Sequence, residues 1–134
     1  MSSAAAKKPR PKYLTLPAIL FEIRLPWPAR VSILHRISGA LLIFPFGAWL
    51  LYMLDVSLAS EAGFERMRGY MQLPLVKIGA LVLIWAYCHH FCAGIRFLFL
   101  DLEKGIELKP ARVTSWIVLA VSLLLTAWLG TKLW

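Results

Sequence analysis

Residues 78–95, with the sequence IGALVLIWAYCHHFCAGI, form an 18-residue run that contains no Lys, Arg, Asp or Glu. About 20 mainly apolar residues are enough for a helix to cross the hydrocarbon core of a bilayer. Two adjacent histidines, His89 and His90, lie inside this run. Ionisable side chains are costly within a membrane and mark functional sites there. We therefore interpret the run as part of a spanning helix whose histidines serve a function.

The spacing around the two histidines favours His90 as a ligand of haem iron. Residues three or four apart lie on one face of a helix, so Ala86, Ala93 and Gly94 share the face of His90. Small side chains allow a flat macrocycle or a neighbouring helix to approach closely, and a neutral imidazole can offer a ring nitrogen to a metal. His89 points about 100° away. The alternative from spacing alone is a pair of histidines hydrogen-bonded to neighbouring helices.

The two cysteines, Cys88 and Cys92, lie one helical turn apart in the same run. A disulfide along one helix has poor geometry, so the sequence predicts no disulfide framework. Together with His89 and His90, the cysteines suggest a zinc site. However, the histidines point away from the face that the cysteines share, so one helix cannot assemble a tetrahedral site from these four residues.

The composition indicates a small integral membrane protein. The 134 residues are 60% hydrophobic and 16% charged, with a mean hydropathy of +0.69. A soluble domain of this size cannot bury so much apolar surface. The formal net charge is +8, but no nucleic-acid-binding motif is present, so no nucleic acid is expected as a partner. Much of the excess charge precedes the first apolar run, which is typical of a topology signal, at Lys7, Lys8, Arg10 and Lys12.

The apolar runs predict an all-α integral membrane fold with three transmembrane helices in an up-down-up arrangement. A polar, proline-rich N-terminal segment, residues 1–28, precedes a three-helix anchor domain, residues 29–134. Pro45 should kink the first helix, and a short amphipathic turn is expected at residues 62–71. The expected spans are residues 29–54, 74–100 and 113–133.

The distribution of Lys and Arg predicts the orientation. Basic residues are frequent in the N-terminal segment and around residues 101–112, and fewer lie in residues 55–73. Since positive charge concentrates on the cytoplasmic side, the N-terminus and residues 101–112 are expected to face the cytoplasm. No cleavable signal peptide is recognisable, which favours the inner (plasma) membrane of a bacterium as the location of this multi-pass protein.

A second polar group begins the first predicted helix. Ser32, His35, Arg36 and Gly39 follow the spacing i, i+3, i+4 and i+7, which places them on one helix face. An arginine near a helix end commonly reaches toward the lipid headgroups, and a serine there commonly caps the helix. A hydroxyl, an imidazole and a cation together could instead bind a quinone carbonyl or a haem propionate. In the predicted orientation, this group and His90 lie in the same leaflet.

Two motifs resemble those of one family. Residues 32–39, SILHRISG, resemble the S-I-x-H-R-x-[ST]-G signature of the cytochrome b556 membrane-anchor subunit of succinate dehydrogenase. Residues 90–101, HFCAGIRFLFLD, resemble the segment H-x-x-x-G-x-R-H-x-x-x-D of the same family. Arg10-Pro11 also fits the N-terminal Arg-Pro of the family. The resemblance covers nearly the whole chain.

This resemblance implies a subunit of complex II. The three helices would form half of a haem-binding anchor bundle, completed by a second membrane-anchor subunit. An iron–sulfur subunit and a flavoprotein subunit would complete the assembly on the membrane. The implied role is to bind haem b, whose iron is shared with the second anchor, and to contribute to ubiquinone reduction in the tricarboxylic acid cycle and respiratory electron transfer.

The resemblance also implies roles for individual residues. His90 would be one axial ligand of the haem iron, and the second anchor subunit would supply the other. Ser32 and Arg36 would line the ubiquinone site beside the iron–sulfur subunit. His35 would lie close to a haem propionate. Arg36, which approaches from the same side, and Gly94, which lies on the face of His90, are also expected at the haem.

Two positions depart from the family motif, and two alternative functions stay open. Phe97 stands where the family has histidine, so it cannot hydrogen-bond a propionate, and His89 has no counterpart role. The chain has neither a flavin motif nor cysteines spaced for iron–sulfur clusters, so it would not oxidise succinate itself. One alternative is the anchor of a fumarate reductase that uses menaquinone. The other is a cofactor-free scaffold or transporter subunit.

Overall fold

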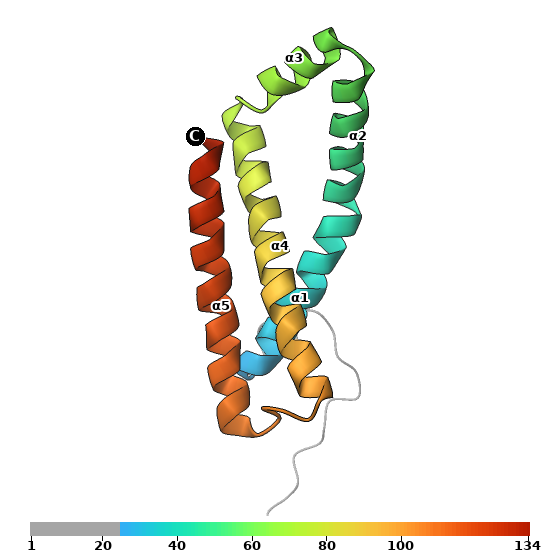
Figure 1. Ribbon diagram of the computed structural model, residues 1–134. Helices are drawn as coiled ribbons and strands as arrows, with labels where there is room; N and C mark the ends of the chain where they lie inside the picture. The colour runs from blue at the N-terminus through green and yellow to red at the C-terminus, as the bar shows by residue number, and fades with distance from the viewer. Residues whose placement is uncertain (1–24) are drawn as a thin grey trace, which may run out of the picture.

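The computed structural model describes residues 25–134, and the predicted N-terminal segment lies mostly outside them. Every regular element in residues 25–134 is helical, which confirms the all-α prediction (Figure 1). The elements are α1 (Trp27–Ile43), α2 (Pro45–Ala59), α3 (Glu61–Tyr70), α4 (Pro74–Asp101), α5 (Leu108–Gly130) and the short 3₁₀ helix η2 (Thr131–Leu133).

Three helices are long and apolar enough to cross a membrane, as predicted. They comprise Trp27–Ala59, which joins α1 and α2, together with Pro74–Asp101 and Leu108–Leu133. The first extends beyond the expected end at residue 54. The third begins at Leu108 rather than at residue 113, because Pro110 does not end the preceding loop. It lies in the first turn of α5, where backbone N–H groups have no intrahelical partner and proline costs little.

Pro45 divides the first span into α1 and α2. Proline has no N–H, and its ring collides with the carbonyl four residues earlier, so it breaks or kinks a helix. Here α1 ends at Ile43, Phe44 donates its N–H to the Ala40 carbonyl at 2.9 Å, and α2 starts at Pro45. Figure 1 shows the consequence: α1 passes close to α4, whereas α2 runs away from α4 before α3 returns the chain to it.

The helices α1, α4 and α5 pack through small side chains. The fully buried positions include Ala86 and Ala93 of α4 and Ser115 and Ser122 of α5. Small residues let helix backbones approach closely in a membrane, where large apolar side chains gain nothing by leaving the lipid. The three helices meet at a cluster formed by Val31, Ala93 and Val118.

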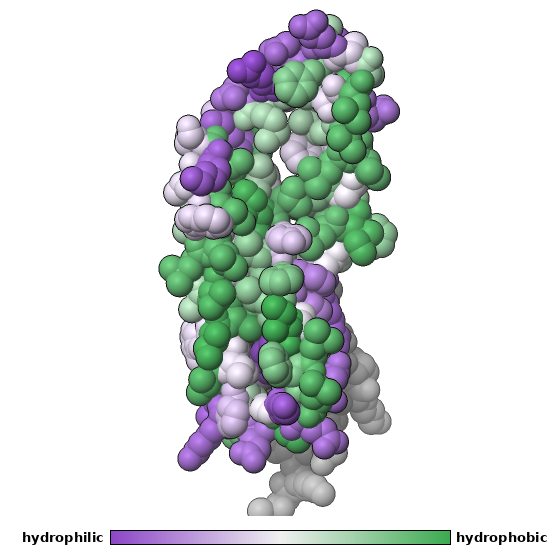
Figure 2. All heavy atoms as spheres, viewed as in Figure 1, coloured by the Kyte–Doolittle hydropathy of each residue, from purple (hydrophilic) through white to green (hydrophobic). Residues whose placement is uncertain are grey.

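The outer surface matches a bilayer. Figure 2 shows hydrophilic residues gathered at the α3 end and at the end with the α4–α5 connection, with a broad hydrophobic surface between them. Large exposed apolar side chains belong to all three spans, among them Leu51, Leu58, Ile78, Leu98, Ile117 and Leu124. The amphipathic turn expected at residues 62–71 is the helix α3, whose N-cap, Ser60, accepts the Gly63 N–H at 3.0 Å.

Candidate functional site

His35 of α1 and His90 of α4 stack on each other where the two helices cross. Their ring centroids are 4.1 Å apart and their planes differ by 10°. The helix face predicted from the spacing of Ser32, His35, Arg36 and Gly39 therefore meets the face of His90, although 55 residues separate the two histidines. The break at Pro45 lies beyond this contact, so it leaves α1 free to pack against α4 here.

A hydrogen bond to the backbone fixes the state of the His90 ring. Its Nδ1 lies 3.0 Å from the His35 carbonyl oxygen and 3.3 Å from the Ser38 hydroxyl, which itself donates to the same carbonyl at 2.9 Å. A carbonyl only accepts hydrogen bonds, so Nδ1 carries the proton. In a neutral ring, Nε2 then holds the free lone pair. Metal-binding histidines are held in this way, with the other ring nitrogen donating to a backbone carbonyl or a carboxylate.

Gly39 makes room for the His90 ring. A methyl group at Gly39 would lie 2.7 Å from Cε1 of His90, closer than real side-chain carbons come, and a tight 3.1 Å from its Nδ1. Any larger residue at this position would therefore displace the imidazole from the His35 carbonyl. Gly94 is less critical for packing within this chain, because a methyl group there would stand 3.8 Å from His35 Nε2, an ordinary contact distance.

His89 lies in a different environment from His90. Its side chain is 0% exposed, and neither ring nitrogen has a hydrogen-bond partner among residues 25–134. Its ring stacks on Trp85 with centroids 5.5 Å apart. His90 is only partly buried. The two histidines thus differ in direction, as the helical period predicted.

Ser32 and Arg36 lie beside the histidine pair on α1 without polar contacts in the described part of the chain. Arg36 is exposed and Ser32 is partly buried. Within residues 25–134 neither side chain forms a hydrogen bond or ion pair, and the single ion pair of that range joins Arg68 to Glu65. The structure therefore brings His35, His90 and Gly94 together and places Arg36 at the outer edge of the group, where a guanidinium could meet a ligand or another subunit.

Similarity to known proteins assigns the chain to a family. The sequence model of the protein family described as the succinate dehydrogenase/fumarate reductase transmembrane subunit matches residues 7–129. The chain belongs to this family. Its relatives include succinate dehydrogenase cytochrome b556 subunits. That of Rickettsia prowazekii (strain Madrid E) is 34% identical over 99 residues, which cover 72% of this chain and 73% of the relative.

Two further relatives carry the same description. The succinate dehydrogenase cytochrome b556 subunit of Coxiella burnetii (strain RSA 493 / Nine Mile phase I) is 30% identical over 119 residues, covering 86% of this chain and 92% of the relative. That of Paracoccus denitrificans is 30% identical over 102 residues, covering 76% and 78%. The resemblance read from the two sequence motifs is thereby confirmed at the level of the family.

In this member of the succinate dehydrogenase/fumarate reductase transmembrane family, Phe97 packs beside the histidine pair. Its ring centroid is 5.0 Å from that of His35, and the Arg96 guanidinium carbon lies 5.6 Å from the Phe97 centroid. Phe97 thus supports His35 by apolar contact, in the position where the quoted family motif has a histidine. Unlike a histidine at this position, the Phe97 ring can neither donate nor accept a hydrogen bond.

Sequence reasoning missed Ser38 and gave Gly39 no role in positioning the His90 ring. Both follow His35 within the SILHRISG motif, at three and four positions. That spacing was the available signal, because residues i+3 and i+4 share the face of residue i. The spacing could not show that the backbone carbonyl of His35 accepts a hydrogen bond from His90 Nδ1.

Proposed function

We propose that this chain is the cytochrome b anchor subunit of a succinate dehydrogenase, or complex II. It would work with a second membrane-anchor subunit and hold an iron–sulfur subunit and a flavoprotein subunit at a bacterial plasma membrane. Family membership supports the anchor role. The observation that carries the cofactor assignment is the His90 ring, whose Nδ1–H is engaged by a backbone carbonyl and whose Nε2 is left as a ligand.

The residues present fit a haem b. Haem brings most ligands of its iron with it, so the protein would need to provide only one or two side chains. His90 would provide one through Nε2, and the second anchor subunit would provide the other. Bound haem would supply a one-electron carrier. Within this chain, the His35 carbonyl and Ser38 orient the His90 ring, and Gly39 leaves the space that the ring occupies.

His35, Arg36 and Gly94 would form the rest of this chain's contribution around the haem. The His35 ring lies against His90 and could donate to a propionate. Arg36 extends from the next position on α1 and offers a cation of fixed charge to a propionate or a quinone. Gly94 lies one turn beyond His90 and has no side chain, so a haem could approach α4 closely there.

Ser32 and Arg36 would serve the quinone. Reduction of ubiquinone takes up two electrons and two protons, and negative charge develops on the quinone oxygens as electrons arrive. A guanidinium placed beforehand stabilises that charge strongly, because little water screens it in a membrane site. The Ser32 hydroxyl would donate a hydrogen bond to a quinone carbonyl. Support comes from position: both residues lie on α1 near its start, beside His35, with no partner in residues 25–134.

The orientation proposed from the charge distribution places the N-terminus and the α4–α5 connection in the cytoplasm. Single cysteines introduced at exposed positions can test it in sealed vesicles with a membrane-impermeant thiol reagent. A cysteine in the α4–α5 connection should react from the cytoplasmic side, and one in α3 from the opposite side. Reaction of an α3 cysteine from the cytoplasmic side would reverse the proposed topology.

A fumarate reductase anchor is the second candidate, because the matching family model includes both enzymes. The relatives described above are succinate dehydrogenase subunits, which favours the first candidate. The assembled complex purified from membranes tests both points. We expect the complex to show a b-type visible spectrum, and we expect succinate to reduce its haem. Absence of any b-type absorbance would remove the haem assignment. A haem that quinol reduces, that fumarate then reoxidises and that succinate fails to reduce would favour the reductase.

A further inference from the structure

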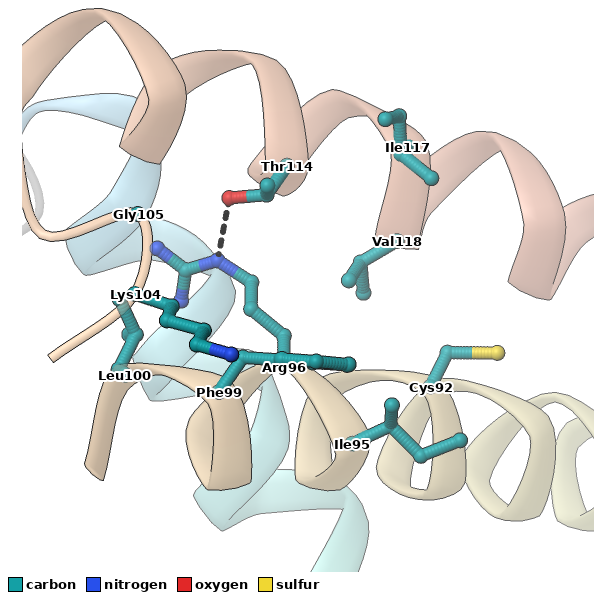
Figure 3. Close-up of a pocket in the computed structure, with 10 residues that line it drawn as sticks. All are labelled: Cys92, Ile95, Arg96, Phe99, Leu100, Lys104, Gly105, Thr114, Ile117 and Val118. Atoms are coloured by element: carbon teal, nitrogen blue, oxygen red, sulfur yellow. Dashed lines mark hydrogen bonds between the residues drawn. The ribbon is translucent and has the colours of Figure 1, made fainter. Parts of the chain in front are cut away.

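A cavity of about 330 Å³ lies between the end of α4, the α4–α5 connection and the first half of α5 (Figure 3). His90 does not line it. Arg96, which does, follows His90 by six residues and so points about 120° away from it around the helix axis. The cavity is therefore separate from the proposed haem and quinone site.

Arg96 is a buried cation without a carboxylate partner in the described chain. Its side chain is 7% exposed. Nε donates to the Thr114 hydroxyl at 3.1 Å, and Nη2 lies 3.5 Å from the Ala111 carbonyl. A guanidinium has five N–H donors, so at least three have no partner among residues 25–134. Buried charges are normally paired, and an arginine held in this way therefore indicates an anion from outside residues 25–134.

Lys104 brings a second cation to the same cavity. The backbone between α4 and α5 adopts positive φ at Glu103 (57°) and Gly105 (78°). The two turns direct the intervening Lys104 back over the end of α4, as Figure 3 shows. The carboxylates nearby in the sequence, Asp101, Glu103 and Glu107, are not among the residues that line the cavity. Among the described residues, its lining thus carries two positive charges and no negative charge.

We propose that this cavity binds one anionic phospholipid. Its phosphate would lie between Arg96 and Lys104, at the end of a spanning helix, where headgroups are found. Arginine matches the geometry of phosphate oxygens, and basic residues at a membrane surface attract anionic lipids. An acyl chain would follow the apolar part of the lining, formed by Ile95, Phe99 and Ile117. Free phosphate shares the headgroup chemistry but gains nothing from these apolar side chains.

The test uses the complete complex, purified in neutral detergent and stripped of loosely held lipid. Phosphatidylglycerol and phosphatidylcholine with identical acyl chains are added separately, and bound lipid is counted by native mass spectrometry. We expect one phosphatidylglycerol to bind more tightly than any phosphatidylcholine. Since one basic residue near a surface contributes about 1 kcal/mol, Lys104→Gln should weaken that binding about fivefold, and Arg96→Gln with Lys104→Gln about 25-fold.

Lys109→Gln is the matched control. Lys109 is an exposed lysine in the first turn of α5 that does not line the cavity, and its replacement should leave the bound phosphatidylglycerol unchanged. If the Arg96 variants fail to assemble, Lys104→Gln decides alone, because Lys104 is exposed and its replacement removes no buried side chain.

Three results would overturn the proposal. Equal binding of the two lipids would show that the cations do not select a charged headgroup, as would be seen if a partner subunit's carboxylate already paired with Arg96. Unchanged binding in Lys104→Gln would exclude the cavity. Complete displacement of the lipid by inorganic phosphate would show a phosphate site without a lipid chain. The b-type spectrum of Lys104→Gln should equal that of the unmodified complex, so this test is independent of the haem proposal.

Discussion

The two interfaces of α4 use their polar groups differently. Along the α4–α5 interface, Ser115, Ser122 and Thr126 donate to carbonyls of their own helix at 2.7–3.0 Å. The bond across this interface comes from a cation, since Arg96 Nε donates to the Thr114 hydroxyl at 3.1 Å. At the α1–α4 crossing, His90 bonds to a carbonyl of the other helix and keeps one ring nitrogen free. The polar side chains of the first interface act as donors, whereas the second also presents a ring nitrogen that could bind a ligand.

The two sides of the bundle also differ in how well this chain covers them. In the most apolar part of the first span, 6% of the residues are buried, against 28% in each of the other two spans. The difference arises at Pro45, which turns α2 away from α4 (Figure 1). The α1–α2 side is therefore where we expect a second anchor subunit to pack, next to the face that carries His90.

Among the variants that test this comparison of the two interfaces, replacement of the proposed ligand, His90, should have the largest effect. His90→Ala removes the oriented Nε2, and we expect loss or severe change of the b-type spectrum in the assembled complex. His89→Ala is the matched control, because His89 is its neighbour but neither of its ring nitrogens has a hydrogen-bond partner among residues 25–134. The control should largely keep the spectrum. The opposite pattern in the two variants would show that the ligand is His89.

Arg36→Ala should slow quinone reduction about 100-fold to 1,000-fold, the usual cost of removing one preorganised donor at a developing charge. Ser32→Ala should have a smaller effect, and Arg36→Lys should recover only part of the rate, because an ammonium lacks the planar fork of a guanidinium. Electron transfer from succinate to a soluble artificial acceptor should stay nearly normal, since that chemistry lies in other subunits.

A second exposed arginine on α1 provides the control for Arg36. Arg30 lies over the Trp27 ring, 4.8 Å from its centroid, and donates to the Leu25 carbonyl. Arg30→Ala should therefore change quinone reduction less than Arg36→Ala. Normal quinone turnover in Arg36→Ala would leave that residue as an ordinary interfacial arginine.

Gly39→Ala tests the space that α1 leaves for the His90 ring. The added methyl group would approach Cε1 to 2.7 Å, so the ring must move away from the His35 carbonyl. Loss of such a supporting hydrogen bond lowers ligand affinity roughly 10-fold to 100-fold, and haem content per complex should fall. Gly79→Ala in α4 is the control, because a methyl group there meets nothing within 4 Å. Equal haem content in both variants would contradict the close contact.

The smallest effect is expected from two fully buried serines, one at each interface, whose replacement by alanine provides the closest comparison. Ser38 and Ser115 each donate to a carbonyl of their own helix, but Ser38 also lies 3.3 Å from His90 Nδ1. Ser38→Ala should weaken haem binding by about tenfold or less. Ser115→Ala should change the melting temperature slightly and haem affinity not at all, since one hydrogen bond contributes about 1 kcal/mol. An equal loss of haem affinity in both variants would contradict the proposed difference between the two interfaces.

Part of this site could be predicted from the sequence because helices have a fixed period. The charge-free run at residues 78–95 predicted a span, Pro45 predicted a kink where the structure has a break, and the 100° step predicted that His89 and His90 face different directions. The same period placed Ser32, His35 and Arg36 on one face. These inferences need no knowledge of how the helices pack.

The rest depends on contacts between helices, which no local pattern contains. The stacking of His35 on His90 requires the crossing of α1 and α4, and the need for Gly39 follows only from the position of the His90 ring. The Arg96–Lys104 cavity arises from a turn with two positive φ values, one of them at Glu103, a residue type that gives no such signal in the sequence.

The most direct test of the account is a chemical rescue of the proposed ligand. In a complex that carries His90→Gly, the b-type spectrum should be lost or severely changed. Added imidazole should restore it, since a free ring could take the place of the His90 imidazole at the proposed haem. The same treatment of a His89→Gly complex should change nothing. An unaltered b-type spectrum in His90→Gly without imidazole would contradict the assignment of His90 as the haem ligand.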